Sequence, residues 1–124
     1  MSLQDELFAI ERGFWERGAP HFREYMDDQC LISFADFAGV RKNADIAAMA
    51  QDAPSWSDID LDARGFLHPT PEFALINYEI GATRTGGDRH RAIVTTGYVR
   101  RGESWKAAFH GQAVLPIEAV SSTL

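Results

Sequence analysis

The chain has 124 residues, of which 45% are apolar, and it carries a formal net charge of −6. This length suffices for one buried core, so we expect a single domain over residues 1–124. The acidic balance argues against a nucleic-acid partner, because phosphate binding relies on clustered Lys and Arg. Cys30 is the only cysteine, which excludes an intrachain disulfide and a thiolate-rich metal site. The acidic amino terminus and the absence of a long apolar run predict a cytoplasmic protein with no membrane partner.

The amino terminus predicts two helices. Apolar residues recur at helical spacing from Leu3 to Phe14, and Gly18 ends the run. Trp15 widens the apolar stripe, which predicts that this helix lies flat on a large surface such as a sheet. A second short helix is expected over about residues 20–26, because proline is favoured in the first turn of a helix.

The middle of the chain predicts two strands and one more helix. A short strand is expected over residues 30–34, and a helix over residues 44–51 that Asn43 caps. Between Trp56 and His68, apolar residues alternate with aspartates, which predicts a strand with one solvated side. Alternate side chains of a strand lie about 7 Å apart, so these carboxylates are poorly placed to share an ion. We expect no metal and no cofactor.

The best hairpin in the sequence lies within residues 93–116 and turns at Arg101 and Gly102, where glycine supplies the positive φ of a tight turn. A loop at residues 85–87 joins it to an earlier strand at residues 73–83. Counting outward from both turns gives the three strands an apolar face and a mixed face. The apolar face carries Ile76, Tyr78, Val94, Tyr98, Trp105 and Phe109.

The mixed face is the predicted site. The register sets Glu79, Ile93 and His110 in one row on it, and we expect the helices to cover this row. The apolar face then lacks a covering element. We therefore expect a homodimer that packs through the apolar sheet face, since such patches are rarely exposed on monomers.

Three stretches make the chain resemble the nuclear transport factor 2-like superfamily, particularly its small uncharacterised bacterial members. They are DDQCLISF at residues 27–34, PSW at residues 54–56 and WKAAFHGQAVLP at residues 105–116. The resemblance implies an α+β fold, in which a cone-shaped, curved antiparallel sheet wraps around the N-terminal helices as a cystatin-like roll with an internal pocket. Members of this superfamily include ketosteroid isomerase, polyketide-cyclase-like enzymes and non-catalytic domains.

The resemblance also indicates where isomerase residues would fall. The tyrosine that ketosteroid isomerases carry in the first helix matches Trp15, their aspartate base falls near Ser33 or Phe34, and their acidic oxyanion donor falls close to Thr95. Neither Ser33 nor Phe34 has a carboxylate. We therefore do not transfer isomerase activity to this chain.

The candidate site residues come from the mixed face and from the resemblance. Candidate catalytic residues are His110 and Glu79, and candidate ligand-binding residues are Trp15, Phe34, Trp56, Arg91, Thr95 and Gln112. The structural alternative is an ordinary cross-strand ion pair between Glu79 and Arg91, with His110 and Gln112 bonded to backbone or water.

Two functions remain open. The first is a small-molecule-binding domain of unassigned activity, with an internal pocket on the concave sheet face. The second is a lyase, isomerase or cyclase-like enzyme that acts on a small apolar carbonyl compound. In that enzyme His110 is the general acid–base, and Glu79 or Asp36 is its charge partner. A pocket filled by Trp15, Phe34 and Trp56 would favour a non-catalytic dimeric module.

Overall fold

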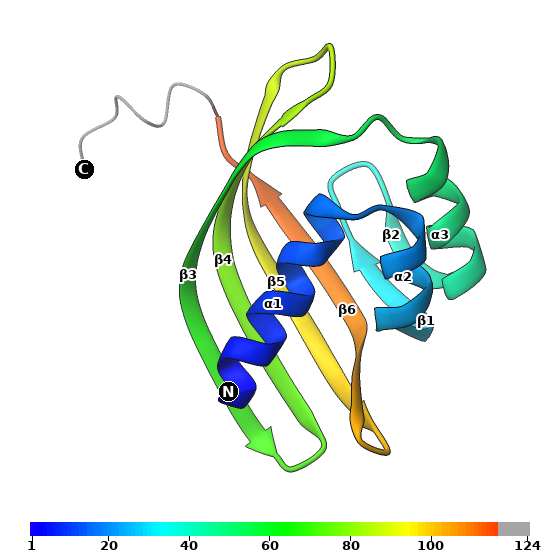
Figure 1. Cartoon of the computed structure of the whole chain (residues 1–124), viewed down its shortest axis with the longest axis vertical. Helices are drawn as coiled ribbons and strands as arrows, with labels where there is room; N and C mark the ends of the chain where they lie inside the picture. Colours follow the sequence, from blue (N-terminus) through cyan, green and yellow to red (C-terminus); the bar gives the residue numbers. More distant parts are fainter. Residues whose placement is uncertain (117–124) are drawn as a thin grey trace.

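The computed structural model describes residues 1–116. Two helices, two strands and a third helix come first, and four long strands follow (Figure 1). The elements are α1 (Leu3–Glu16), α2 (Ala19–Tyr25), β1 (Met26–Ser33), β2 (Ala38–Lys42), α3 (Asn43–Asp52), β3 (Trp56–Thr70), β4 (Phe73–Arg84), β5 (Arg89–Arg101) and β6 (Ser104–Val114). The expected single domain over residues 1–124 extends beyond the described residues at its carboxyl end.

One mixed sheet holds all the described strands, in the order β2-β1-β6-β5-β4-β3. The expected α+β fold is confirmed, and the sheet curves around α1 without closing (Figure 1). Two features differ from the expectation of a wholly antiparallel sheet. β1 pairs with β6 in parallel, and β2 forms a strand where the sequence suggested only a link. Within residues 1–116, no helix is both long and apolar enough to cross a membrane.

Helix α1 begins at Leu3, because Ser2 is its N-cap and the Ser2 hydroxyl accepts from the Asp5 amide at 3.1 Å. Helix α3 begins differently. Its N-cap is Lys42, and the Asn43 side chain instead donates to backbone carbonyls at the end of α2 and the start of β1. Asn43 therefore joins α3 to the preceding elements and does not cap it.

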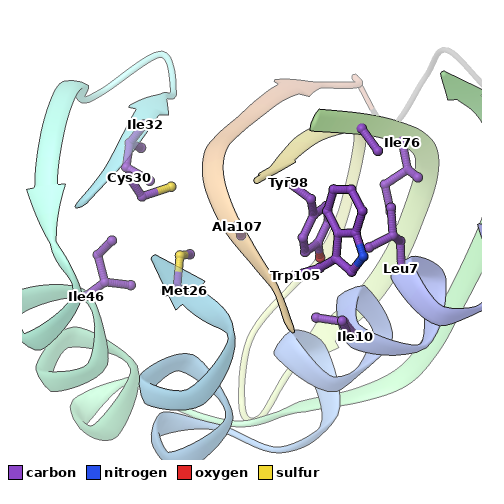
Figure 2. Close-up of a cluster of buried hydrophobic side chains, with 11 residues drawn as sticks. Leu7, Ile10, Met26, Cys30, Ile32, Ile46, Ile76, Tyr98, Trp105 and Ala107 are labelled. Atoms are coloured by element: carbon purple, nitrogen blue, oxygen red, sulfur yellow. The ribbon is translucent and has the colours of Figure 1, made fainter. Parts of the chain in front are cut away.

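The core lies between α1 and one face of the sheet, which we call the inner face; the opposite face is the outer face. In Figure 2, Leu7 of α1 lies beside Ile76, Tyr98 and Trp105, while the smaller group around Cys30 lies farther along the sheet. Trp15 extends the contact to a second cluster with Tyr78 and neighbouring strand residues. The helix thus packs on the even-numbered residues of β4 and β5.

The predicted register between β4 and β5 is confirmed. Tyr78 pairs with Val94, Glu79 pairs with Ile93, and the Arg84 amide donates to the Asp88 carbonyl at the end of the hairpin. Glycines in the connecting loop satisfy the turn, as Gly86 has a φ of +74°.

The predicted register between β5 and β6 is wrong. The turn lies at Gly102 and Glu103, so Arg101 pairs with Ser104, and Gly102 occupies the first turn position with a φ of +63°. Ala108 is then an extra residue on β6, because Tyr98 pairs with Ala107 but Gly97 pairs with Phe109. A bulge of one residue moves every later side chain to the other face of the sheet.

The structure overturns two expectations, and the bulge explains the first of them. Phe109 lies on the outer face, and His110 pairs with Thr96 on the inner face, so Glu79, Ile93 and His110 do not form a row. Most of the face expected to be free for a homodimer is buried under α1, as its members Ile76, Tyr78, Val94, Tyr98 and Trp105 all belong to the core. The helices cover the inner face, and the outer face carries Glu79 and Ile93.

Candidate functional site

A carboxylate lies at the centre of the inner face. Glu11 is on α1, and its exposed fraction is 0%. Its Oε2 accepts hydrogen bonds from the Tyr78 hydroxyl at 2.6 Å and from the Thr96 hydroxyl at 2.7 Å, and its Oε1 accepts from the Tyr98 hydroxyl. Burying a carboxylate without partners is very costly, whereas charge-assisted donors of this kind offset the cost.

All three donors are side chains of the sheet, and the strand geometry alone brings them together. Thr96 and Tyr98 are two residues apart on β5, so their side chains point to the same face, and Tyr78 lies on the neighbouring strand β4. The Tyr78 oxygen also accepts a hydrogen bond from Trp15 Nε1 at 3.0 Å. Because the buried Glu11 carboxylate disfavours a second negative charge, burial and Glu11 hold the pKa of Tyr78 and of Tyr98 well above its usual value.

His110 continues the network toward the surface. Its Nδ1 lies 3.0 Å from Thr96 Oγ1 and 3.7 Å from Glu11 Oε2, and its side chain is 14% exposed. Burial lowers the pKa of His110 below its usual value, and the negative charge of Glu11 opposes that effect only in part. Burial thus favours the neutral imidazole form of His110.

Gln112 links His110 to a second histidine. Gln112 Nε2 lies 3.0 Å from His110 Nε2, and Gln112 Oε1 lies 2.8 Å from His90 Nε2. Both Gln112 and His90 are half-buried. The five residues Glu11, Thr96, His110, Gln112 and His90 thus form one hydrogen-bonded series, which we call the polar chain, running from the core to a half-exposed end.

Every hydrogen bond of the polar chain runs in the same direction. Thr96 donates its only hydrogen to Glu11, so its oxygen accepts from His110 Nδ1–H. His110 Nε2 is then the acceptor for the Gln112 amide nitrogen. The Gln112 oxygen accepts from His90 Nε2–H. Each donor therefore points toward the carboxylate, and both histidine tautomers are defined.

Aromatic rings surround the half-exposed end of the polar chain. The His90 ring contacts both Trp15 and Trp56, with ring centroids 6.1 Å and 5.5 Å away, and the two tryptophan rings are themselves 5.2 Å apart. Phe34 meets the His110 ring edge to face at 5.7 Å. Both Trp56 and Phe34 are half-buried, so apolar surface and hydrogen-bonding groups are exposed side by side.

The structure divides the candidate residues between the two faces. It brings five of them together on the inner face, namely Trp15, Phe34, Trp56, His110 and Gln112. The other three, Glu79, Arg91 and Thr95, lie on the outer face. There Glu79 forms ion pairs with Arg91 and with Arg64, which agrees with the structural alternative considered for it. Neither Glu79 nor Asp36, an exposed loop residue, is the charge partner of His110. Glu11 has that position.

Sequence reasoning missed five members of this site: Glu11, Thr96, the hydroxyls of Tyr78 and Tyr98, and His90. A signal for Glu11 was present, because it lies four residues from both Leu7 and Trp15 within the buried stripe of α1. A charged residue in such a stripe indicates a buried polar partner. No comparable signal marks His90, since its position depends on the register of β6.

The two most distinct cavities among the described residues lie away from His110. One, of about 580 Å³, is bounded by α2, β1, the start of α3 and the β5–β6 hairpin, with Arg23, Asn43 and Arg101 in its wall. The other, of about 290 Å³, lies beside α1 and α2 near Gly13 and His21. The inner face itself is filled by side chains. An internal pocket is therefore not evident on the concave face.

The sequence matches no family model and no curated protein. Solved structures are similar to it in fold. An NTF2-like protein of unknown function from Prochlorococcus marinus has a TM-score of 0.74 and 16% identity, over 98% of this chain and 100% of that one. A ketosteroid isomerase-like protein from Erwinia carotovora atroseptica has a TM-score of 0.72 and 11% identity, over 92% and 94%.

A third structure, a domain of unknown function with a cystatin-like fold from Nostoc punctiforme, has a TM-score of 0.71 and 14% identity, over 98% of this chain and 84% of that one. The chain therefore has the NTF2-like fold, as its resemblance implied. Because all these identities are low, the similarity establishes the fold and leaves the function to be argued from the site.

Proposed function

We propose that this protein is a small-molecule-binding domain, and that its ligand binds at the half-exposed end of the polar chain. The observation that carries this proposal is the directed series of hydrogen bonds from His90 to Glu11. It holds two imidazoles and an amide in defined orientations beside exposed aromatic rings. Ligand sites combine apolar walls with a few fixed polar groups in this way. The ketosteroid isomerase-like neighbour supports a ligand in this fold.

The chemistry of the exposed end favours a small, largely apolar carbonyl or carboxylic compound. Trp56 and Phe34 offer ring surfaces for an apolar body. Gln112 uses one amide hydrogen for His110, so its second amide hydrogen is available for a ligand oxygen. The Glu11 carboxylate is enclosed by its three hydroxyl donors, and Thr96, His110 and Gln112 separate it from the half-exposed end.

An NMR titration tests the proposal. The imidazole signals of His90 and His110 are followed while a panel of small ketones, keto acids and carboxylic acids is added. We expect at least one compound to shift both histidines in wild type and to lose affinity in Gln112→Leu. Glu79→Gln, on the outer face, is the matched control and should bind as wild type does. The proposal fails if no compound shifts either histidine, or if Glu79→Gln weakens binding as much as Gln112→Leu.

The orientation of His110 favours an enzyme as the second candidate function. Its Nδ1 faces Thr96 and Glu11, and its Nε2 points toward the half-exposed end, which is how a general base is held. In this reading a lyase, isomerase or cyclase-like reaction begins when a proton passes from the carbon next to a carbonyl group to His110 Nε2, after Gln112 has moved aside. Glu11 stabilises the imidazolium that forms.

Proton exchange in heavy water detects this activity without a known product. We expect the protein to speed deuterium incorporation next to the carbonyl group of a bound compound, and His110→Gln to lose that effect while still binding. If His110→Gln exchanges as fast as wild type, His110 is not the base.

The outer face supports a homodimer. One row of paired residues crosses the whole sheet, and every member is apolar or glycine: Val40, Leu31, Phe109, Gly97, Leu75 and Leu67. No described helix covers it, and Val40, Leu31 and Leu67 are 59%, 48% and 60% exposed. A second copy is the occupant we propose. The nearby ion pairs of Glu79 with Arg64 and Arg91 present both signs of charge, which a two-fold partner can match.

A further inference from the structure

Gln112 contacts two histidines with two chemically different atoms. Its Oε1 faces His90 Nε2 at 2.8 Å, and its Nε2 faces His110 Nε2 at 3.0 Å. An amide oxygen only accepts a hydrogen bond and an amide nitrogen only donates one. The two imidazoles must therefore present opposite groups to Gln112. At present His90 presents N–H and His110 presents a bare nitrogen.

The other nitrogen of His110 has no freedom to adapt. The Thr96 hydroxyl gives its hydrogen to Glu11, so Thr96 can only accept from His110 Nδ1–H. A proton that is added to His110 can therefore go only to Nε2, the nitrogen that faces Gln112.

Protonation of His110 consequently requires the Gln112 amide to flip, so that its oxygen and its nitrogen exchange places. Its oxygen must then accept from His110 Nε2–H, and its NH₂ group must face His90. A neutral His90 can adapt to the flipped amide by changing tautomer, so that its hydrogen moves from Nε2 to Nδ1. A protonated His90 cannot, because both of its nitrogens carry hydrogens. Two protonated imidazoles would leave one N–H facing the NH₂ group.

We propose that Gln112 couples His90 and His110 into a pair that takes up one proton readily and a second proton only with difficulty. Gln112 is a positioning residue in this pair, because it acts through the orientation of its amide. The two protonation steps then belong to the pair and not to either histidine alone.

Among the described residues, one negative charge lies close to the pair. Glu11 on α1 faces His110 at 3.7 Å, and Thr96 and Phe34 beside His110 are uncharged. Trp15 and Trp56 contact His90, and Arg84 lies over the Trp56 ring, 3.9 Å from its centroid. Both Glu11 and Arg84 act on one histidine each, so neither reproduces an effect that passes through Gln112.

The use of this pair in binding rests on the proposed function. A site that holds a single proton presents an N–H group at one imidazole and a bare nitrogen at the other, which suits a ligand with one acceptor and one donor. The coupling itself involves only the three side chains. It can therefore be tested without a ligand, so its failure is distinguishable from a failure of ligand binding.

The test is a double-mutant cycle read by NMR titration of the His110 ring nitrogens. The four proteins are wild type, His90→Phe, Gln112→Leu and the double variant; phenylalanine keeps an aromatic ring beside Trp15 and Trp56. Without His90, the Gln112 amide is free to flip and to accept a hydrogen bond from a protonated His110. We expect His90→Phe to raise the titration midpoint of His110 by about one pH unit, a tenfold change in proton affinity. In the Gln112→Leu background the same change should have almost no effect.

Equal shifts in both backgrounds would mean that the histidines interact through their charges alone, and they would overturn the role of Gln112. No shift in wild type would overturn the coupling itself. Gln112→Glu gives an independent check, because a carboxylate accepts from both imidazoles at once. We expect both histidines to take up protons at higher pH in Gln112→Glu than in wild type. A Gln112→Glu protein whose histidines titrate as in wild type would contradict the proposal.

Discussion

At the scale of single residues, Glu11 joins helix α1 to the sheet through hydroxyl donors on two strands. The Tyr78, Tyr98 and Thr96 hydroxyls are all buried, and Glu11 is their acceptor. A buried donor that loses its acceptor costs about 1–3 kcal/mol. The side chain of Glu11 therefore affects stability through three partners at once.

Glu11→Ala should lower the free energy of unfolding by at least about 3 kcal/mol, because it leaves these hydroxyls without an acceptor and opens a cavity. Urea unfolding measures the loss. Glu16→Ala is the matched control on the same helix, since Glu16 is exposed and within residues 1–116 pairs with Arg12 alone, and it should cost less than about 1 kcal/mol. Similar losses for the two variants would show that the Glu11 network contributes little.

Two buried histidines predict how stability depends on pH. Burial lowers the pKa of both His21 and His110 below the usual value near 6.5. As the pH falls through this value, the unfolded chain binds more protons than the folded protein does. The free energy of unfolding should therefore decrease as the pH decreases. A carboxylate that is ion-paired, such as Asp27 with Arg101, acts in a lower range, because its pKa is lowered from a value near 3.8.

Urea midpoints between about pH 7.5 and pH 5 measure this effect, since the reference pKa of histidine lies within that range. The change of the urea midpoint with pH should be smaller in His110→Asn than in wild type. It should stay unchanged in His68→Asn, because His68 is exposed. A stability that is constant or rises toward pH 5 would contradict the assigned charge states.

At the scale of elements, the contact between α1 and α2 depends on a glycine. A Cβ atom at Gly13 would lie 2.1 Å from the ring of His21. That ring is held in place by a hydrogen bond of 2.7 Å between its Nε2 and the Ile10 carbonyl oxygen. The ring also meets Phe14 edge to face, with centroids 4.8 Å apart. The absence of a side chain at Gly13 thus lets α2 pack closely on α1.

Gly13→Ala should therefore destabilise the protein by about 1–3 kcal/mol, the usual cost of overpacking. This is opposite to the gain of roughly 0.5–1 kcal/mol that alanine brings to an unconstrained helix position. In a His21→Ala background the same substitution should become stabilising. Thermal or urea unfolding of the four proteins gives the comparison, and a Gly13→Ala protein more stable than wild type would contradict the close contact.

The elements also show where sequence reasoning succeeds and where it fails. The β4–β5 hairpin was predictable because its glycines mark the turn and its strands pair without interruption. The β5–β6 register was not, because the extra residue at Ala108 leaves no signature in the alternation. That single residue moved His110 and Gln112 from the face of Glu79 to the face of Glu11.

At the scale of the whole molecule, the resemblance predicted the fold. The residue pattern did not predict which face of the sheet the helices cover. Aromatic strand residues such as Tyr78 and Tyr98 fit a dimer interface and a helix-covered core equally well from sequence alone. Their hydroxyls decide in favour of the core, because they bond to Glu11 on α1. The outer face, which carries Glu79, is the surface that we propose for a second copy.

Light scattering tests the outer face as an interface between two copies. We expect wild type to be a dimer at micromolar concentration and Leu31→Lys to shift it to the monomer, because a buried unpaired charge is costly in an apolar contact. Met49→Lys is the matched control, since Met49 is also an exposed apolar residue, 60% against 48% for Leu31, but lies on α3. A monomeric wild type, or a Leu31→Lys protein that associates as Met49→Lys does, would contradict the proposed interface.

The most direct test of the proposed site is the crystal structure of wild type with a bound compound chosen from the NMR panel. We predict electron density for the compound against Trp56 and Phe34, with a hydrogen bond to Gln112 or His90. Density instead in the cavity near Arg23 and Asn43, or beside Gly13, would contradict the account by placing the ligand site away from the polar chain.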